Sequence, residues 1–165
     1  MNLFGGKLPE AGGRFEGFPT TVFLYRYMLD LPWPMYWPER PHAELFDGEH
    51  VLLLRRVSYF PSFSEIAESA NPGEVSDGGT IPRIAWGLTS TPFRNFLLGY
   101  FIHDRISKDA RILNMNDCHK MAVARRLFGD QLLYVMVKDL GGSESRARRI
   151  YRGVRLGAMG SGLWR

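Results

Sequence analysis

The chain has one cysteine, Cys118, among its 165 residues. A lone cysteine cannot form an internal disulfide, which excludes a small secreted scaffold stabilised by disulfides. Long hydrophobic runs are also absent, because the longest largely apolar stretch, residues 96–102, is far shorter than the roughly 20 residues that span a bilayer. The N-terminus lacks the charged start and apolar stretch of a signal peptide. We therefore expect a soluble protein, without a transmembrane segment, in a reducing compartment.

Charge is distributed unevenly along the chain. Residues 1–80 carry 6 basic and 11 acidic side chains, whereas residues 81–165 carry 15 basic and 6 acidic ones. Our preferred interpretation is that the two halves attract each other, within one fold or between copies. The alternative is a basic face for an anionic lipid surface or for nucleic acid. No motif that interleaves aromatic and basic residues supports nucleic acid, so we do not expect it as a partner.

The sequence predicts a single α+β domain with 45% hydrophobic residues, enough to fill a core. Residues 1–41 are rich in glycine, proline and aromatics and should form an irregular arm, apart from a candidate strand at 21–28. Residues 42–165 should form the globular domain, with a small β element around 50–59 and one helical turn at 64–69. Three helices are predicted at 92–107, 115–139 and 144–157, with Thr91 and Ser143 capping the first and the last.

The pair His103-Asp104 lies in the most apolar of these helices. Helical periodicity puts Asp104 on the same arc as several large apolar side chains, where a carboxylate is costly without a partner. His103 is at the edge of that arc, one turn from Gly99, which leaves room beside the imidazole. On the middle helix, Asp117 shares a face with Met121 and other apolar residues, so it should point inward, whereas His119 should lie at the surface.

A glycine-containing loop precedes the first helix and begins Ser76-Asp77-Gly78-Gly79. Two adjacent glycines can turn tightly and direct backbone carbonyls at a ligand, although such pairs often only make turns. A glycine-rich loop, a His-Asp pair and a carboxylate on a second helix together form a recurrent hydrolytic arrangement. In that arrangement oxygen ligands bind Ca²⁺, a histidine activates water and a second aspartate orients the histidine.

The order of these motifs resembles a family of small phage and prophage proteins of unassigned function. The similar segments are DGGTIPR, then HD, then an Asp-led helix, then IYRGVRLGAMGSGLW, and together they cover residues 73–164. The usual family pattern is Asp-Gly-Ala-Ser-Ile-Pro-Arg followed by His-Asp-x-x-Tyr. Membership would imply a phage-encoded protein made in the host cytoplasm, and either incorporated into the virion or associated with other phage structural proteins or with itself.

The same pattern is similar to the core of prokaryotic phospholipase A2. This resemblance implies that His103 is the general base, that Asp117 holds its imidazole, and that Asp104 is the carboxylate ligand of Ca²⁺. Carbonyl groups around Asp77, Gly78 and Gly79 would complete the metal shell. The chain departs from the pattern at Ser107, where a tyrosine is expected, and in having no disulfides. The implied activity is Ca²⁺-dependent hydrolysis of lipid or envelope esters.

A non-catalytic interpretation is equally compatible with the sequence. Asp104 could pair with Arg83 or Arg94, and His103 with Asp117, in a buried polar network of a virion or assembly component. A metal phosphohydrolase would need more histidines on the inner helix faces, and no Gly-x-Ser-x-Gly nucleophile motif precedes a helix. The arginines of the last helix are expected to form a solvated strip, whose plain interpretation is a surface face that pairs with the acidic first half of the chain. The functional alternative is contact with an acidic partner protein or, second in rank, anionic lipid; the strip's members are Arg148, Arg152 and Arg155.

Overall fold

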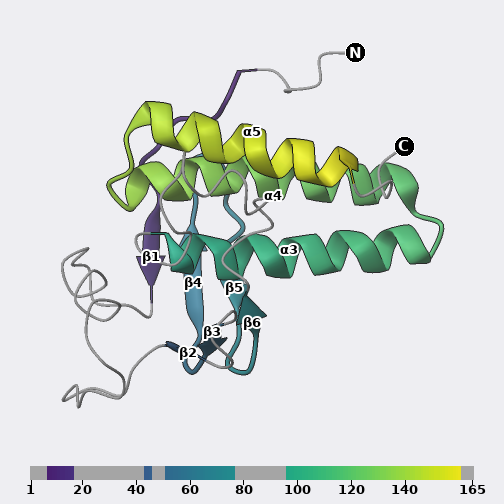
Figure 1. Ribbon diagram of the computed structural model, residues 1–165, viewed down its shortest axis with the longest axis horizontal. Coiled ribbons are helices and arrows are strands. Elements are labelled where there is room, and N and C mark those ends of the chain that lie inside the picture. Colours follow the sequence, from purple (N-terminus) through teal and green to yellow (C-terminus); the bar gives the residue numbers. More distant parts are fainter. Residues whose placement is uncertain (1–6, 17–42, 46–50, 77–95, 161–165) are drawn as a thin grey trace.

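A computed structural model describes residues 7–16, 43–45, 51–76 and 96–160 of the protein (Figure 1). In this part of the chain the fold is α+β, as the sequence predicts, with three helices and six short strands. The helices are α3 (Leu97–Met115), α4 (His119–Asp139) and α5 (Glu144–Gly160). The strands are β1 (Arg14–Glu16), β2 (Ala43–Leu45), β3 (Val51–Leu53), β4 (Val57–Phe60), β5 (Glu68–Ala70) and β6 (Val75–Ser76).

The strands form two small antiparallel sheets. One has the order β1-β4-β5, with Phe15 opposite Tyr59 and Ser58 opposite Ser69, and the other has the order β2-β3-β6. Helix α3 contacts β4, β5 and β6 on one side and α4 on the other, and α5 packs against α4 (Figure 1). Helix α4 also reaches the strands, because its Arg125 is paired with Glu68 of β5. None of the described helices combines the length and the apolar character that crossing a membrane requires.

The strands depart from the sequence-based expectation in three places. The predicted β element at 50–59 is two strands, β3 and β4, from different sheets. The predicted helical turn at 64–69 is wrong, because the chain becomes extended at β5 and pairs with β4. Strand β1 lies in the segment expected to be irregular, where it pairs with β4. The candidate strand at 21–28 and the predicted cap at Thr91 lie outside the described residues.

The first two helix boundaries also differ from the prediction. Helix α3 continues to Met115 instead of ending at residue 107, and α4 begins at His119 instead of residue 115. The reason is the polar second half of α3, which breaks the apolar pattern without breaking the helix. The start of α5 after Ser143 is confirmed, since the Ser143 hydroxyl accepts a hydrogen bond from the backbone N–H of Arg146 at 3.4 Å.

Both helix ends at the α3–α4 and α4–α5 turns use a residue in the left-handed conformation. Gly141 has a φ of +85° after α4, and Asp117 has a φ of +59° after α3. At the α3 end, the Cys118 N–H donates to the Leu113 carbonyl at 2.9 Å and the Asp117 N–H donates to Asn114 at 3.2 Å. These are the two hydrogen bonds of a Schellman motif, in which aspartate can replace the usual glycine.

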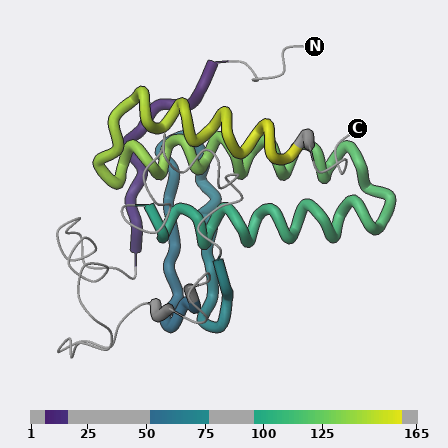
Figure 2. The backbone as a smooth tube through the Cα atoms, in the orientation of Figure 1, coloured from purple at the N-terminus to yellow at the C-terminus, as the bar shows by residue number. Residues whose placement is uncertain are grey.

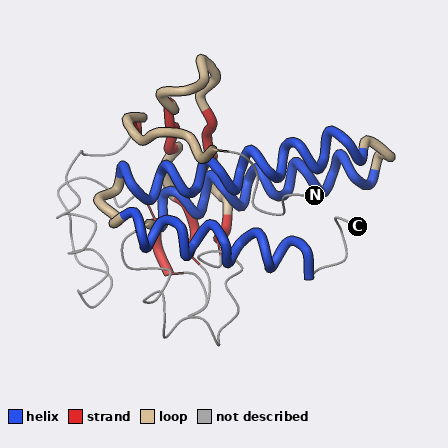
Figure 3. The backbone as a smooth tube through the Cα atoms, turned by 90° about the horizontal axis from the view of Figure 1, so that it is seen from above, coloured by secondary structure: helices blue, strands red, loops and turns tan. Residues whose placement is uncertain are grey.

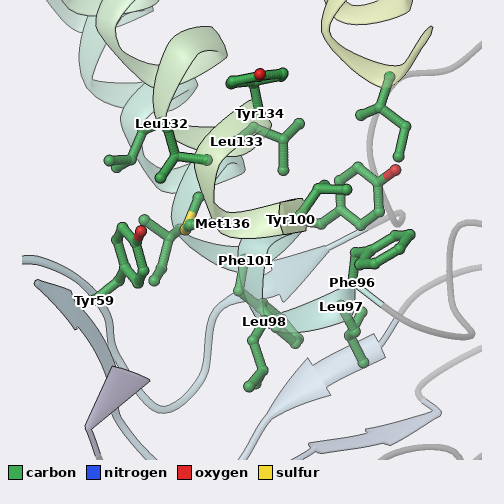
Figure 4. Close-up of a cluster of buried hydrophobic side chains, with 14 of the residues drawn as sticks. Tyr59, Phe96, Leu97, Leu98, Tyr100, Phe101, Leu132, Leu133, Tyr134 and Met136 are labelled. Carbon is green, nitrogen blue, oxygen red and sulfur yellow. The ribbon is translucent and has the colours of Figure 1, made fainter. Parts of the chain in front are cut away.

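The main core lies between α3 and α4 and extends onto β4 (Figure 4). It is built from large apolar side chains of both helices that are buried almost completely. Members include Tyr59, Tyr100, Phe101, Ile102, Leu132, Leu133 and Met136. Six consecutive residues of α4, 132–137, are buried, because this half of α4 is enclosed by other elements on all sides.

Residues 7–16 are attached to the end of α4 (Figure 2). The Asp139 carboxylate accepts hydrogen bonds from the backbone N–H groups of Gly12 and Gly13, at 2.9 and 3.0 Å, and from the hydroxyl of Tyr59. These donors offset the unfavourable position of a carboxylate at the negative end of a helix. The contact joins three segments that are distant in the sequence: β1, β4 and α4.

Gly129 of α4 lies tightly against Ile106 of α3, and this predicts an asymmetric effect of alanine substitutions. A Cβ atom at Gly129 would lie 2.7 Å from Cγ2 of Ile106, a stiff β-branched side chain. We expect Gly129→Ala to lower the free energy of unfolding by about 1–3 kcal/mol in urea denaturation. Gly153→Ala in α5 is the matched control, since nothing lies within 4 Å of its added Cβ, and it should be neutral or stabilising by up to about 1 kcal/mol. Equal effects at the two positions would contradict this packing.

Candidate functional site

His103 lies between α3 and α4, and only 1% of its side chain is exposed. Its Nε2 atom is 2.8 Å from Oδ1 of Asp130, which is fully buried on α4. Its Nδ1 atom is 3.5 Å from Oδ1 of Asp104 but makes no hydrogen bond to the protein. Because a carboxylate accepts, Nε2 donates its proton to Asp130. In the neutral imidazole this leaves the Nδ1 lone pair unpaired.

Asp130 joins all three helices through its carboxylate. Oδ1 accepts from His103 of α3 and from Nε of Arg126, one turn earlier in α4, at 3.0 Å. Oδ2 accepts from a terminal nitrogen of Arg155 in α5 at 3.1 Å. Four ionisable side chains, all buried or nearly buried, therefore meet at the Asp130 carboxylate. An anion at 0% exposure is tolerated here because three donors, two of them permanent cations, replace its water.

The cluster shifts the pKa values of its members. Burial alone would lower the pKa of His103, but the carboxylates of Asp104 and Asp130 outweigh burial and raise the pKa above 6.5. Burial alone would raise the pKa of Asp130, but His103 and the two arginines lower it below 3.8. Asp130 therefore stays ionised and stabilises the protonated imidazole.

Asp104 has its partner at the edge of the β2-β3-β6 sheet. The Ser76 hydroxyl at the end of β6 donates to Oδ2 of Asp104 at 2.5 Å. The Asp104 side chain is 15% exposed, so it is less enclosed than its position on the apolar arc predicts. Ser76 immediately precedes Asp77 in the sequence. The start of the predicted glycine loop is thus tied to the carboxylate beside His103.

Asp117 is not the partner of His103, and this prediction is wrong. The residue precedes α4 instead of lying within it, and its side chain is exposed. Asn116-Asp117 ends α3 with a left-handed residue, so the helical wheel that turned Asp117 inward did not apply. Met121 of the same predicted face is also exposed, whereas His119 is at the surface as expected.

The sequence contains a signal that Asp130 is buried, which the helical-wheel argument for the middle helix did not use. Asp130 follows Gly129 and stands in the apolar stretch LFGDQLLYVMV, where an acidic residue needs a buried partner. With α4 beginning at His119, the buried line of its first half is Ala122, Arg126 and Gly129. Because residues 132–137 are buried all round, the apolar pattern could not select the face that meets α3.

Ser107 does not replace the tyrosine expected at its position. Its hydroxyl donates to the His103 carbonyl at 2.8 Å, a bond that is local to α3. The hydroxyl is therefore engaged with the helix backbone.

The predicted Ca²⁺ ligands are only partly described. Asp77, Gly78 and Gly79 lie outside the described residues, as do Arg83 and Arg94. Within the described part of the chain, no group of three or more His, Cys, Asp or Glu side chains is arranged to hold a metal ion. Asp104 supplies one carboxylate there, which falls short of the roughly six to eight oxygen ligands that Ca²⁺ takes.

The arginine strip predicted on α5 is divided between two roles. Arg152 is exposed, and Arg148 forms an ion pair with Glu144 at 2.6 Å on the helix surface. Arg155, in contrast, points inward to Asp130. The expectation of one solvated strip is wrong for Arg155 because the third helix supplies a cation to the buried carboxylate.

Removing the charge of Asp130 should strongly destabilise the protein. Asp130→Asn keeps the shape of the side chain but leaves two arginines without their anion, so we expect a loss of about 3–5 kcal/mol in urea denaturation at pH 7. Asp117→Asn is the matched control, since Asp117 is exposed and asparagine tolerates its left-handed backbone, and it should change stability by less than about 0.5 kcal/mol.

The loss of stability caused by Asp130→Asn should become smaller as the pH falls. The pKa of Asp130 is lower in the folded state than its ordinary value of 3.8, so its contribution is fully present above pH 3.8. It is lost as the pH falls through the folded-state pKa. The stability gap between the wild type and Asp130→Asn should therefore shrink below pH 3.8. A gap that stays constant down to pH 2 would contradict the lowered pKa.

Comparison of the chain with protein-family models, with curated proteins and with solved structures found no match.

Proposed function

We propose that the protein is a hydrolase of carboxylic esters of phospholipase A2-like type, encoded by a phage and directed at lipid or envelope esters. The observation that carries the proposal is the state of His103. One ring nitrogen is bound to a buried carboxylate on a second helix, and the other, beside Asp104, has no hydrogen bond to the protein. This is the arrangement of a general base whose orienting group is already in place.

The proposed reaction uses the two nitrogens in different ways. In the neutral form of His103, Nδ1 removes a proton from a water molecule as the water oxygen bonds to the ester carbonyl carbon. The imidazolium then donates this proton to the leaving alkoxide oxygen as the carbon–oxygen bond breaks. The products are a carboxylic acid and an alcohol, and the base is regenerated. Asp130 retains the Nε2 proton throughout and stabilises the transient positive charge.

The neighbours of the imidazole also support a site at this position. Asp104 is held by Ser76, so the last described residue before the Asp77-Gly78-Gly79 segment contacts the carboxylate beside His103. The described residues alone do not make a Ca²⁺ shell, so the proposed mechanism uses the His-Asp pair without a metal step. Because His103 is 1% exposed, hydrolysis also requires that water and ester reach Nδ1.

The second candidate is a non-catalytic virion or assembly protein. It is favoured by the burial of His103 and by the three donors on Asp130, which connect α3, α4 and α5. In this case the network fixes the packing of the helices and performs no chemistry.

One variant distinguishes the two candidates. In His103→Gln, the side-chain amide can still donate to Asp130, but no nitrogen is left to accept a proton at the position of Nδ1. If the protein is a hydrolase, release of fatty acid from phospholipid vesicles should fall by about a hundredfold or more, while the thermal unfolding midpoint and the circular dichroism spectrum remain close to wild type.

The assay is run in EDTA and in Ca²⁺, and His119→Gln serves as the control because His119 is exposed. That variant should retain full activity. Equal release by wild type and His103→Gln would overturn the catalytic role of His103. Absence of release by wild type under both conditions would favour the assembly protein. A response to Ca²⁺ that Asp104→Asn removes would support the metal that the resemblance implies.

A further inference from the structure

The far end of the α3–α4 hairpin carries an exposed apolar surface that the proposed hydrolysis does not use. We define the hairpin tip as residues 108–124, which comprise the end of α3, the turn and the start of α4. In Figures 1 and 3 this turn lies at one end of the molecule, beyond the end of α5 and away from both sheets. Its exposed large apolar side chains are Ile112, Met115, Met121 and Val123.

One stripe of α3 connects the tip to the core. Phe101, Asp104, Lys108, Ile112 and Met115 follow one another at helical spacing of three or four residues. In the first half of the helix this stripe packs on the strands, and Phe101 is 1% exposed. Lys108, further along the stripe, donates from its ammonium to the Val75 carbonyl in β6 at 3.4 Å. Beyond it the same stripe is open to solvent, and Met115 is 82% exposed.

The same segment also carries exposed cations. Lys108, Arg111 and Lys120 are all exposed, and none of them has a carboxylate partner among the described residues. Of the two acids in the tip, Asp109 is already paired with Arg105 and Arg125, which leaves Asp117. The tip therefore combines cations that have no carboxylate partner among the described residues with exposed apolar side chains on two adjacent helices.

From this combination we infer that the hairpin tip docks on an anionic phospholipid surface. The apolar side chains enter the boundary between headgroups and acyl chains, while the lysines and the arginine remain at the level of the phosphates. An apolar protein surface would leave Arg111 and Lys120 without an anionic partner, whereas an anionic bilayer satisfies the cations and the apolar side chains together. The inference does not depend on hydrolysis, because binding requires no reaction at His103.

Co-sedimentation with vesicles tests the inference. The full chain is mixed with vesicles of ether-linked phosphatidylcholine, or of equal parts of ether-linked phosphatidylcholine and phosphatidylglycerol, so that ester hydrolysis cannot change the lipid. We expect binding to the mixed vesicles, weakened by salt, and little binding to phosphatidylcholine alone. Failure to sediment with the mixed vesicles would overturn the inference and leave the hydrolase proposal untouched.

Matched variants locate the binding surface. Ile112→Ser and Leu156→Ser remove side chains with the same exposed fraction, 57%, from the tip and from α5. The double variant Arg111→Gln/Lys120→Gln is paired with Arg149→Gln/Arg152→Gln, which removes two exposed cations from α5. Each tip variant should weaken vesicle binding by about tenfold, and each α5 variant by less than about threefold.

Two outcomes would contradict the assignment. Equal losses in the tip and α5 variants would mean that binding reflects overall charge. A dimer of the wild type that Met115→Ser dissociates would mean that the tip binds a second copy of the chain. Since all substituted side chains are exposed, unchanged thermal unfolding midpoints are the check that the variants fold.

Discussion

The buried carboxylate of Asp130 is the contact on which the helical part of the structure depends. It accepts one donor from each of α3, α4 and α5, and no part of the side chain reaches solvent. The apolar core between α3 and α4 supplies most of the burial, but apolar contacts alone would permit small shifts of one helix along another. A carboxylate with three fixed donors permits one arrangement, because any shift leaves a buried charge without its partner.

The same contact prepares His103 for chemistry and makes it costly to move. Asp130 fixes the orientation of the ring by holding Nε2, and it directs Nδ1 toward Asp104. The His103–Asp130 hydrogen bond therefore contributes both to stability and to the proposed activity. A histidine held only by packing could rotate, whereas this one has a single tautomer in its neutral form.

The sequence predicted the α+β class and the start of α5, because each follows from a local pattern. It placed His103 at the edge of the apolar arc with room beside the ring, whereas only 1% of the side chain is exposed. Apolar periodicity marks α3, and Gly141 before Ser143 marks the break between α4 and α5. The partner of His103 could not be found in this way. Its identity depends on the exact start of α4, and Asp117 ends a helix by adopting a left-handed conformation that aspartate seldom takes. Pairing of β1 with β4 depends on residues more than forty positions apart and has no local signature.

The attachment of residues 7–16 to Asp139 has a consequence for the order of folding. Gly12 and Asp139 are 127 positions apart, so the loop that their hydrogen bond closes contains most of the domain. During synthesis, which proceeds from the N-terminus, this segment must wait until α4 has emerged from the ribosome before its carboxylate acceptor exists. Early in synthesis, β1 can pair with β4, but the hydrogen bonds from Gly12 and Gly13 to Asp139, which fix the position of this segment, cannot yet form. The first part of the domain to be made is therefore among the last to be secured, and closing this long loop is expected to slow the final stage of folding.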